Sequence, residues 1–222
     1  MSKSPHAMLE LFPIYSSMAP SQVTNLAVSS VTATTINGSY NTLGGNQPNT
    51  YGNAIFLWQS PNQIPYNTPP LATFQIPGNT QSGSFSFPGL QVQIKSYIMG
   101  YAVGPNVSQI CSTAYVPASG TDWQYFQSML SVQDLGTDSV TINYQTPSGN
   151  QPQTNGNWVG LWQGEVPSYT NPPAAKTNVD NNNAVGQATI NNYPFLRGTT
   201  YTVAYFMGSK QTMMAASYTF ST

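Results

Sequence analysis

The feature that most constrains this chain is that one stretch of sequence occurs twice. Residues 44–59 read GGNQPNTYGNAIFLWQ, and residues 149–163 read GNQPQTNGNWVGLWQ. Asn46 and Asn150 occupy the same place in the two copies and are 104 residues apart (150 minus 46). The same spacing joins further pairs of identical residues: Leu26 and Leu130, Tyr40 and Tyr144, Trp58 and Trp162, Tyr97 and Tyr201, and Gly104 and Gly208. Such a period is too long for a solenoid repeat and suits an independently folded module, so the sequence predicts an internal duplication.

Each predicted module alternates short runs of apolar and polar residues with turns rich in Pro, Gly and Asn. In residues 139–147 (SVTINYQTP), Val140, Ile142 and Tyr144 fall on one face of a strand. Residues 97–104 (YIMGYAVG) alternate in the same way. No apolar pattern of helical period runs longer than a turn or two. Several short strands at this spacing predict an all-β chain built as antiparallel sandwiches.

Several segments carry a resemblance to a known family. Residues 196–208 (LRGTTYTVAYFMG) resemble the tyrosine-bearing strand of fibronectin type III and related immunoglobulin-like domains, and residues 87–104 are similar. SVTINYQTP resembles the second strand of that family, with Tyr40 and Tyr144 where the family typically has Trp. Residues 158–163 (WVGLWQ) resemble its third strand. The resemblance implies two tandem immunoglobulin-like sandwich domains and implies no activity, because such domains serve as spacers, adhesion modules and ligand binders alike.

The duplication predicts the domain boundaries. Residues 1–20 have no counterpart before the second copy and contain three prolines, so they are predicted to form an extended arm. The first module is expected to span residues 21–117, a linker residues 118–125, and the second module residues 126–222. An ordered arm would have to lie on its own domains or on a neighbouring molecule, because free termini usually fray.

The scarcity of charge limits the partners. Charged residues make up 5% of the chain, and its formal net charge is −1. Nucleic acids and anionic membrane surfaces are bound by clustered Lys and Arg, and five scattered bases cannot form such a cluster. The surface must therefore be neutral and rich in the hydrogen-bonding groups of Asn, Gln, Ser, Thr and Tyr. Neutral glycans, or copies of this chain in a homo-oligomer, are the expected partners, because low net charge favours association.

The sequence lacks the materials of an enzyme. The sole histidine, His6, lies in the arm, so no nucleophile–histidine pair can form within a module. The acids are scattered, and Glu165 and Asp180 have no acidic counterpart in the first copy. Cys111 is the only cysteine, which excludes an intrachain disulfide and a conventional zinc site. We expect no enzymatic activity, no catalytic residue, no metal and no cofactor.

The N-terminal residues suggest where the chain is made. They lack a continuous apolar run of the kind found in signal peptides, and no segment is long and apolar enough to span a bilayer. We expect synthesis in the cytoplasm and no insertion into a membrane. Non-classical release, or assembly outside the cell, stays open as an alternative.

The repeated motif is the strongest candidate for a binding site. Its first half predicts a turn, because Gly and Asn tolerate positive φ and Pro fixes the exit from the turn. Its second half enters a strand whose outer face carries Trp58 in one copy and Trp158, Gly160 and Trp162 in the other. A glycine between two indoles predicts a flat slot on which a sugar ring stacks beside amide side chains.

A tyrosine followed by two prolines comes soon after each of these strands and predicts a second wall of the same site. The residues predicted to bind ligand are Asn53, Trp58, Gln59, Tyr66, Asn157, Trp158, Trp162, Gln163 and Tyr169. The alternative is structural: the tryptophans can belong to a strand that is buried on both faces at a domain junction, and the proline-rich loops can serve as rigid packing.

Two functions of different classes follow from these features. The first is a lectin-like protein that binds neutral glycans at equivalent sites, one per module, and gains avidity from having two. The second is a self-assembling structural protein of a filament, a shell or an inclusion body. In that case the N-terminal arm would contact a neighbouring subunit, for example by adding a strand to an open sheet edge.

Overall fold

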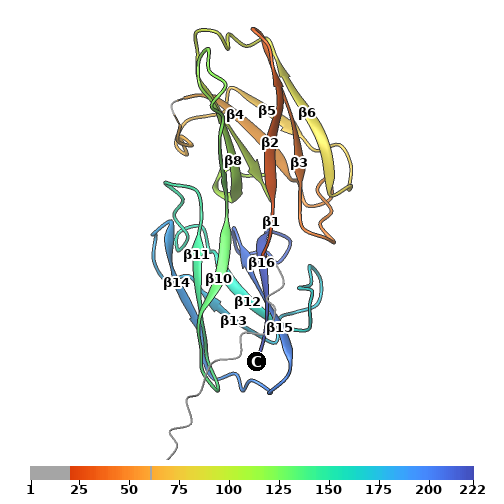
Figure 1. Ribbon diagram of the computed structural model, residues 1–222, viewed down its shortest axis with the longest axis vertical. Helices are drawn as coiled ribbons and strands as arrows, with labels where there is room; N and C mark the ends of the chain where they lie inside the picture. The colour runs from red at the N-terminus through yellow and green to blue at the C-terminus, as the bar shows by residue number, and fades with distance from the viewer. Residues whose placement is uncertain (1–20, 61) are drawn as a thin grey trace, which may run out of the picture.

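The computed structural model describes residues 21–60 and 62–222, so the predicted arm, residues 1–20, lies outside the described residues. The described chain is all-β, as predicted, apart from one short 3-10 helix, η1 (Val107–Gln109). Figure 1 shows two β-sandwiches placed end to end along the long axis of the molecule. Within the described residues, no helix has the length and apolar character needed to cross a bilayer.

Each sandwich pairs a three-stranded sheet with a larger one. In the first sandwich the sheets are β2-β3-β6 and β5-β4-β7-β8-β9, and in the second they are β10-β11-β14 and β1-β16-β15-β12-β13. All strand pairs are antiparallel, and their registers are continuous apart from single bulges. The strands are β1 (Gln22–Val23), β2 (Asn25–Val31), β3 (Thr35–Asn41), β4 (Ala54–Gln59), β5 (Ala72–Gln75), β6 (Ser82–Pro88), β7 (Tyr97–Ala102), β8 (Ile110–Val116), β9 (Gln124–Gln127), β10 (Met129–Leu135), β11 (Val140–Gln145), β12 (Trp158–Gln163), β13 (Ala175–Asn178), β14 (Val185–Ile190), β15 (Thr200–Phe206) and β16 (Met214–Ser221).

The alternation seen in the sequence becomes the inner face of each three-stranded sheet. In β11, Val140, Ile142 and Tyr144 are buried while the residues between them are partly exposed, as their spacing predicts. The ring of Tyr144 packs at 5.3 Å from that of Tyr205 on the opposite sheet. Residues two apart on a strand thus fill the space between the sheets, where aromatic rings pack among aliphatic side chains.

The central strands of the larger sheets are buried on both faces. All six residues of β7 are buried, and so are the first five residues of both β4 and β12. Their inner faces join the main core, and their outer faces form a smaller apolar cluster in each sandwich. Each outer cluster is covered by the loop that follows the tryptophan strand, which supplies Ile64 and Tyr66 in the first sandwich and Tyr169 in the second.

The two sandwiches exchange their first strands. β1 comes just before β2 of the first sandwich, yet it pairs with β16 of the second, with Val23 opposite Ala216 (Figure 1). β9 comes just before β10 of the second sandwich, yet it pairs with β8 of the first, with Gln127 opposite Ser112. Val23 and Gln127 are 104 residues apart, and so are Ser112 and Ala216, so the exchange is reciprocal.

Hydrogen bonds beyond the strand ladders fasten this exchange. The amide of Thr24 donates to the carbonyl of Ala215 at 3.2 Å, and the amide of Ser128 donates to that of Cys111 at 2.7 Å. The main cores of the two sandwiches, without the outer clusters, form one continuous apolar cluster. The strand pairing therefore crosses the predicted module boundary, because each sandwich is completed by a strand from the other half of the sequence.

Candidate functional site

The three tryptophans of the repeated motif are buried. The exposed fractions are 2% for Trp58, 6% for Trp158 and 7% for Trp162. The indole Nε1 of Trp58 donates to the carbonyl of Thr68 at 2.9 Å, and that of Trp162 donates to Asn171 at 3.2 Å. A buried indole needs such an acceptor, so the first role of these two residues is to hold the proline-rich loop over the sheet.

The flat slot predicted at Gly160 is closed, and this prediction is wrong. A Cβ atom at Gly160 would lie 2.7 Å from the Trp162 ring and 2.8 Å from the Trp158 ring, so the two indoles close over the glycine. Trp158 also stacks on Phe206 with 3.9 Å between ring centroids and 6° between planes. The ammonium of Lys176 lies 5.6 Å from the centroid of the Trp158 ring. The two tryptophans share one face of the sheet, as predicted, but both indoles pack against Phe206 and fill the space between them over Gly160.

The packing at Gly160 predicts a large effect of one methyl group. We expect Gly160→Ala to lower the free energy of unfolding by about 1–3 kcal/mol, the usual cost of overpacking a core. Gly44→Ala is the matched control, because nothing lies within 4 Å of a Cβ placed there. Urea denaturation of the two variants provides the measurement, and equal stabilities would contradict the packing described here.

Of the predicted amide residues, all within the described part of the chain, only Asn157 lines a cleft with one of the tryptophans, Trp158, and that cleft has a volume of about 530 Å³. Asn53 and Asn157 are 1% and 0% exposed and bind neighbouring tyrosines inside the sandwiches. The Asn53 Oδ1 accepts from the Tyr101 hydroxyl at 2.9 Å, and the Asn157 Nδ2 donates to the Tyr205 hydroxyl at 3.1 Å. Their places are inside the fold, away from solvent. Two further predicted residues, Gln59 and Gln163, are exposed at the ends of β4 and β12.

The two loop tyrosines lie at the junction between the sandwiches, and each reaches the other half of the chain. A Cβ placed on Gly149 of the second sandwich would lie 3.3 Å from the ring of Tyr66. A Cβ placed on Gly45 of the first would lie 3.4 Å from the ring of Tyr169. Both glycines have a φ of 84°, which the turn of the repeated motif requires. Motif and loop therefore meet across the junction, which no pattern within one copy could indicate.

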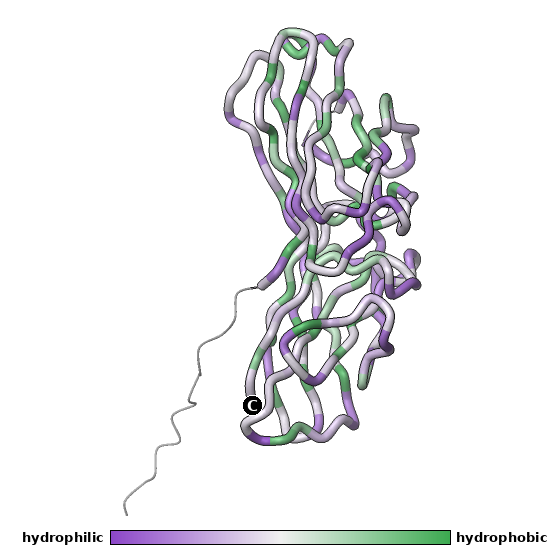
Figure 2. The backbone as a smooth tube through the Cα atoms, turned by 90° about the vertical axis from the view of Figure 1, so that its right-hand side faces the viewer, coloured by the Kyte–Doolittle hydropathy of each residue, from purple (hydrophilic) through white to green (hydrophobic). Residues whose placement is uncertain are grey.

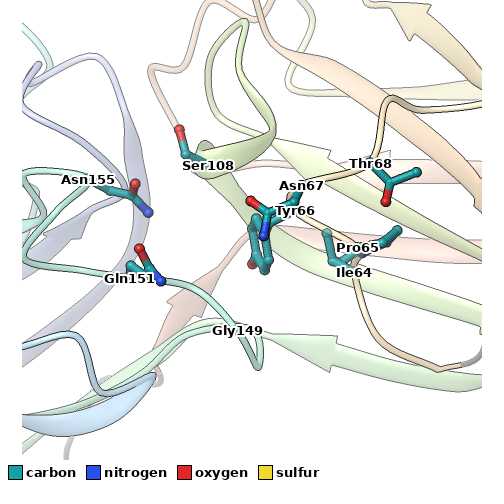
Figure 3. Close-up of a pocket in the computed structure, with 9 residues that line it drawn as sticks. All are labelled: Ile64, Pro65, Tyr66, Asn67, Thr68, Ser108, Gly149, Gln151 and Asn155. Carbon is teal, nitrogen blue, oxygen red and sulfur yellow. The ribbon is translucent and has the colours of Figure 1, made fainter.

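An open cleft lies on the Tyr66 side of this junction (Figure 3). Its volume is about 590 Å³. One wall is the loop of the first sandwich, and the facing wall is the turn of the repeated motif in the second. The residues that line it are Ile64, Pro65, Tyr66, Asn67, Thr68, Ser108, Gly149, Gln151 and Asn155. Every one of these side chains is neutral, and five of them carry an amide or a hydroxyl in addition to Tyr66.

Only Tyr66 of the predicted binding residues lines this cleft. The sequence indicates no binding role for Gln151 or Asn155, because the run Gly-Asn-Gln-Pro that contains Gln151 predicts only a turn and Asn155 differs from its counterpart, Tyr51. In Figure 3 the amide ends of both point into the space facing Tyr66. Figure 2 shows that the loops gathered at one side of the junction are predominantly hydrophilic.

Burial keeps the groups at the junction uncharged. It raises the pKa of Tyr66 and of Tyr169 well above the ordinary tyrosine value, and the nearby Cys111 adds to both shifts. It also raises the pKa of the Cys111 thiol to about 12. Among the described residues, neither tyrosine hydroxyl has a hydrogen-bond partner. Within residues 21–60 and 62–222, no group of His, Cys, Asp or Glu side chains is placed so that it could hold a metal ion.

Comparison with known proteins gives little to add to this geometry. No family model matches the chain, and no curated protein matches it. The chain is similar to a solved structure described as "Biofilm associated protein - BSP domain", with 14% identity and a TM-score of 0.26. The match covers 83% of this chain and 26% of that one, so the chain spans a minor part of that structure's length. A likeness of this size assigns no function to the chain.

Proposed function

We propose that this chain is a non-enzymatic binding protein that takes a neutral glycan in the cleft over Tyr66. The observation that carries the proposal is the composition of the cleft, which combines one aromatic ring with amides and hydroxyls and has no charged side chain. Its volume of about 590 Å³ lies in the range of small-molecule sites, roughly 300–1,000 Å³. We propose also that the sandwiches are of the immunoglobulin-like type, which the pairing of a three-stranded with a five-stranded antiparallel sheet in each sandwich supports.

The chemistry of the cleft favours a sugar over other neutral molecules. A sugar ring has a face of C–H groups that packs on an aromatic ring and a rim of hydroxyls that needs donors and acceptors. Tyr66 offers the ring, and Asn67, Gln151 and Asn155 offer amides that both donate and accept. A charged ligand would lose hydration without a counter-charge, which is costly, and an apolar ligand would leave the amides unsatisfied.

The proposal is tested first with a glycan array on the intact labelled chain. We expect selective hits among neutral glycans and a loss of affinity in Gln151→Ala of about 3- to 10-fold, the size of one neutral hydrogen bond. Gln47→Ala is the matched control. Gln47 stands 104 residues before Gln151, is equally exposed and lies outside the cleft, so its removal should leave the hits unchanged. A blank array, or equal effects of both variants, would count against the proposal.

Self-assembly stays the alternative. Its support in the sequence is the near-absence of repulsive charge and the arm of residues 1–20, which lies outside the described residues. Light scattering of the full chain and of a variant without these residues is the direct measurement. Assembly that is lost with the arm, together with a blank array, would favour this second function.

A further inference from the structure

The two sides of the junction are built alike, which makes each a reference for the other. Gly45 meets Tyr169 on one side, and Gly149 meets Tyr66 on the other. The turns that carry these glycines close with the same bond: the amide of Tyr51 donates to Gln47, and that of Asn155 donates to Gln151, each at 2.9 Å. Tyr51 and Asn155 therefore occupy equivalent positions, 104 residues apart.

The equivalent positions 51 and 155 carry different side chains, and this difference leaves only the Tyr66 side of the junction open. The ring of Tyr51 stacks on that of Tyr169, with 5.6 Å between centroids and 25° between planes. The Asn155 side chain is too short to cover Tyr66. The space that corresponds to the one filled by the Tyr51 ring is therefore open on the Tyr66 side and forms the cleft. Tyr169 is accordingly buried, at 8% exposed, whereas Tyr66 is partly exposed.

A second difference acts in the same direction. The Gln211 Nε2 donates to the loop carbonyls of Ser168 at 2.7 Å and Asn171 at 2.6 Å, which fastens the covered side. Its counterpart 104 residues earlier is Val107, which has no polar group and packs against the apolar cluster under the loop instead. Only the covered side has this added fastening.

We infer that a single pyranose ring of the ligand stacks on the ring of Tyr66. Its position corresponds to the one that the Tyr51 ring occupies against Tyr169 on the other side of the junction. The chain then has one such site. The inference rests on the proposed function and makes it more specific, because Tyr51 serves as an internal stand-in for the ligand ring. A phenol ring and a pyranose ring are similar in size, and offset stacking at this separation is the favoured geometry of packed rings.

The replacement of an aromatic residue by Asn155 also explains why the ring should carry hydroxyls. The Asn155 Nδ2 donates to the Asn150 Oδ1 at 2.7 Å, which fixes the amide and leaves its Oδ1 to accept from a ligand hydroxyl. The Gln151 amide and the Ser108 hydroxyl lie on the same cleft. The cleft thus offers a ring face below and hydrogen-bonding groups around it.

The experiment moves the site from one side of the junction to the other. Saturation-transfer NMR with methyl pyranosides of the gluco, galacto and manno series is measured on the full chain, with p-cresol as a phenol probe. We expect at least one pyranoside to bind the wild type and Asn155→Tyr to abolish its binding, because the introduced ring fills the cleft. The double variant Asn155→Tyr/Tyr51→Asn should regain binding over Tyr169, and this regain cannot arise from misfolding.

The outcomes separate the inference from the proposed function. If a pyranoside binds the wild type but Asn155→Tyr leaves its binding unchanged, the position of the ring is wrong while glycan binding stands. If the double variant is folded by circular dichroism and does not regain binding, the equivalence of the two sides is wrong. Binding of p-cresol in place of every pyranoside would overturn the sugar assignment. If no probe binds the wild type, the proposed function fails and the inference fails with it.

Discussion

Residues 1–121 and residues 122–222, produced as separate chains, are each expected to fail to fold. Each fragment would lack the strand that completes its larger sheet, because β1 pairs with β16 and β9 pairs with β8. Each would also expose side chains buried at the junction, among them Leu43 at 4% exposed in the first half and Tyr169 at 8% in the second. An open sheet edge beside newly exposed apolar surface is a template for aggregation, so we expect insoluble or poorly structured fragments.

Co-production of the two fragments is expected to restore the native structure, because every contact of the intact chain can then form. Circular dichroism and thermal unfolding are the measurements. As a control, the intact chain is produced with a protease site between Thr121 and Asp122, which are both exposed. The chain folds first and is then cut at this site. The two fragments should then stay together on a sizing column until denaturant is added. A cooperative unfolding transition in either fragment alone would show that the modules are independent, as the repeat length by itself suggested.

The sequence predicted the local structure of this protein better than its connections. Alternation in residues 139–147 was sufficient to identify β11, because a strand with one buried face imposes a period of two. β7 was identified from residues 97–104 as a strand, but the sequence did not indicate that both of its faces are buried. The exchange could not be predicted in this way. β1 contains two residues, Gln22 and Val23, and nothing in so short a segment indicates which sheet edge it will join.

The candidate site was predicted in part for a similar reason. Periodicity correctly placed Trp158 and Trp162 on the outer face of β12. Whether an outer face meets solvent depends on loops and on the other half of the chain, and periodicity contains no information on either. The cleft depends on the difference between Tyr51 and Asn155, which becomes informative only when both are seen against Tyr169 and Tyr66.

The chain is expected to unfold cooperatively in alkali, in a range that starts near pH 10. Burial raises the pKa of four tyrosines, Tyr66, Tyr101, Tyr169 and Tyr205, above the ordinary value of 10.0. The unfolded chain therefore loses these protons first as the pH rises. Stability is fully present below pH 10 and falls above it by about 1.4 kcal/mol per pH unit for each group. Four groups would cost about 6 kcal/mol at pH 11, which is comparable to the whole stability of a small domain.

The double variant Tyr66→Phe/Tyr169→Phe tests this mechanism, because it removes two ionising groups that make no hydrogen bond within the described chain. At neutral pH we expect its free energy of unfolding to equal or exceed that of the wild type, since two buried hydroxyls are no longer desolvated. In alkali we expect its unfolding midpoint to move to higher pH.

Tyr125→Phe, at a ring that is 47% exposed, is the control and should leave the midpoint unchanged. In the wild type, the tyrosinate absorbance that comes from the buried tyrosines should appear together with the loss of the circular dichroism signal. Ionisation of the buried tyrosines near pH 10 with the fold intact would show that solvent enters the junction freely. The distinction between a closed Tyr169 side and an open Tyr66 side would then lose its basis.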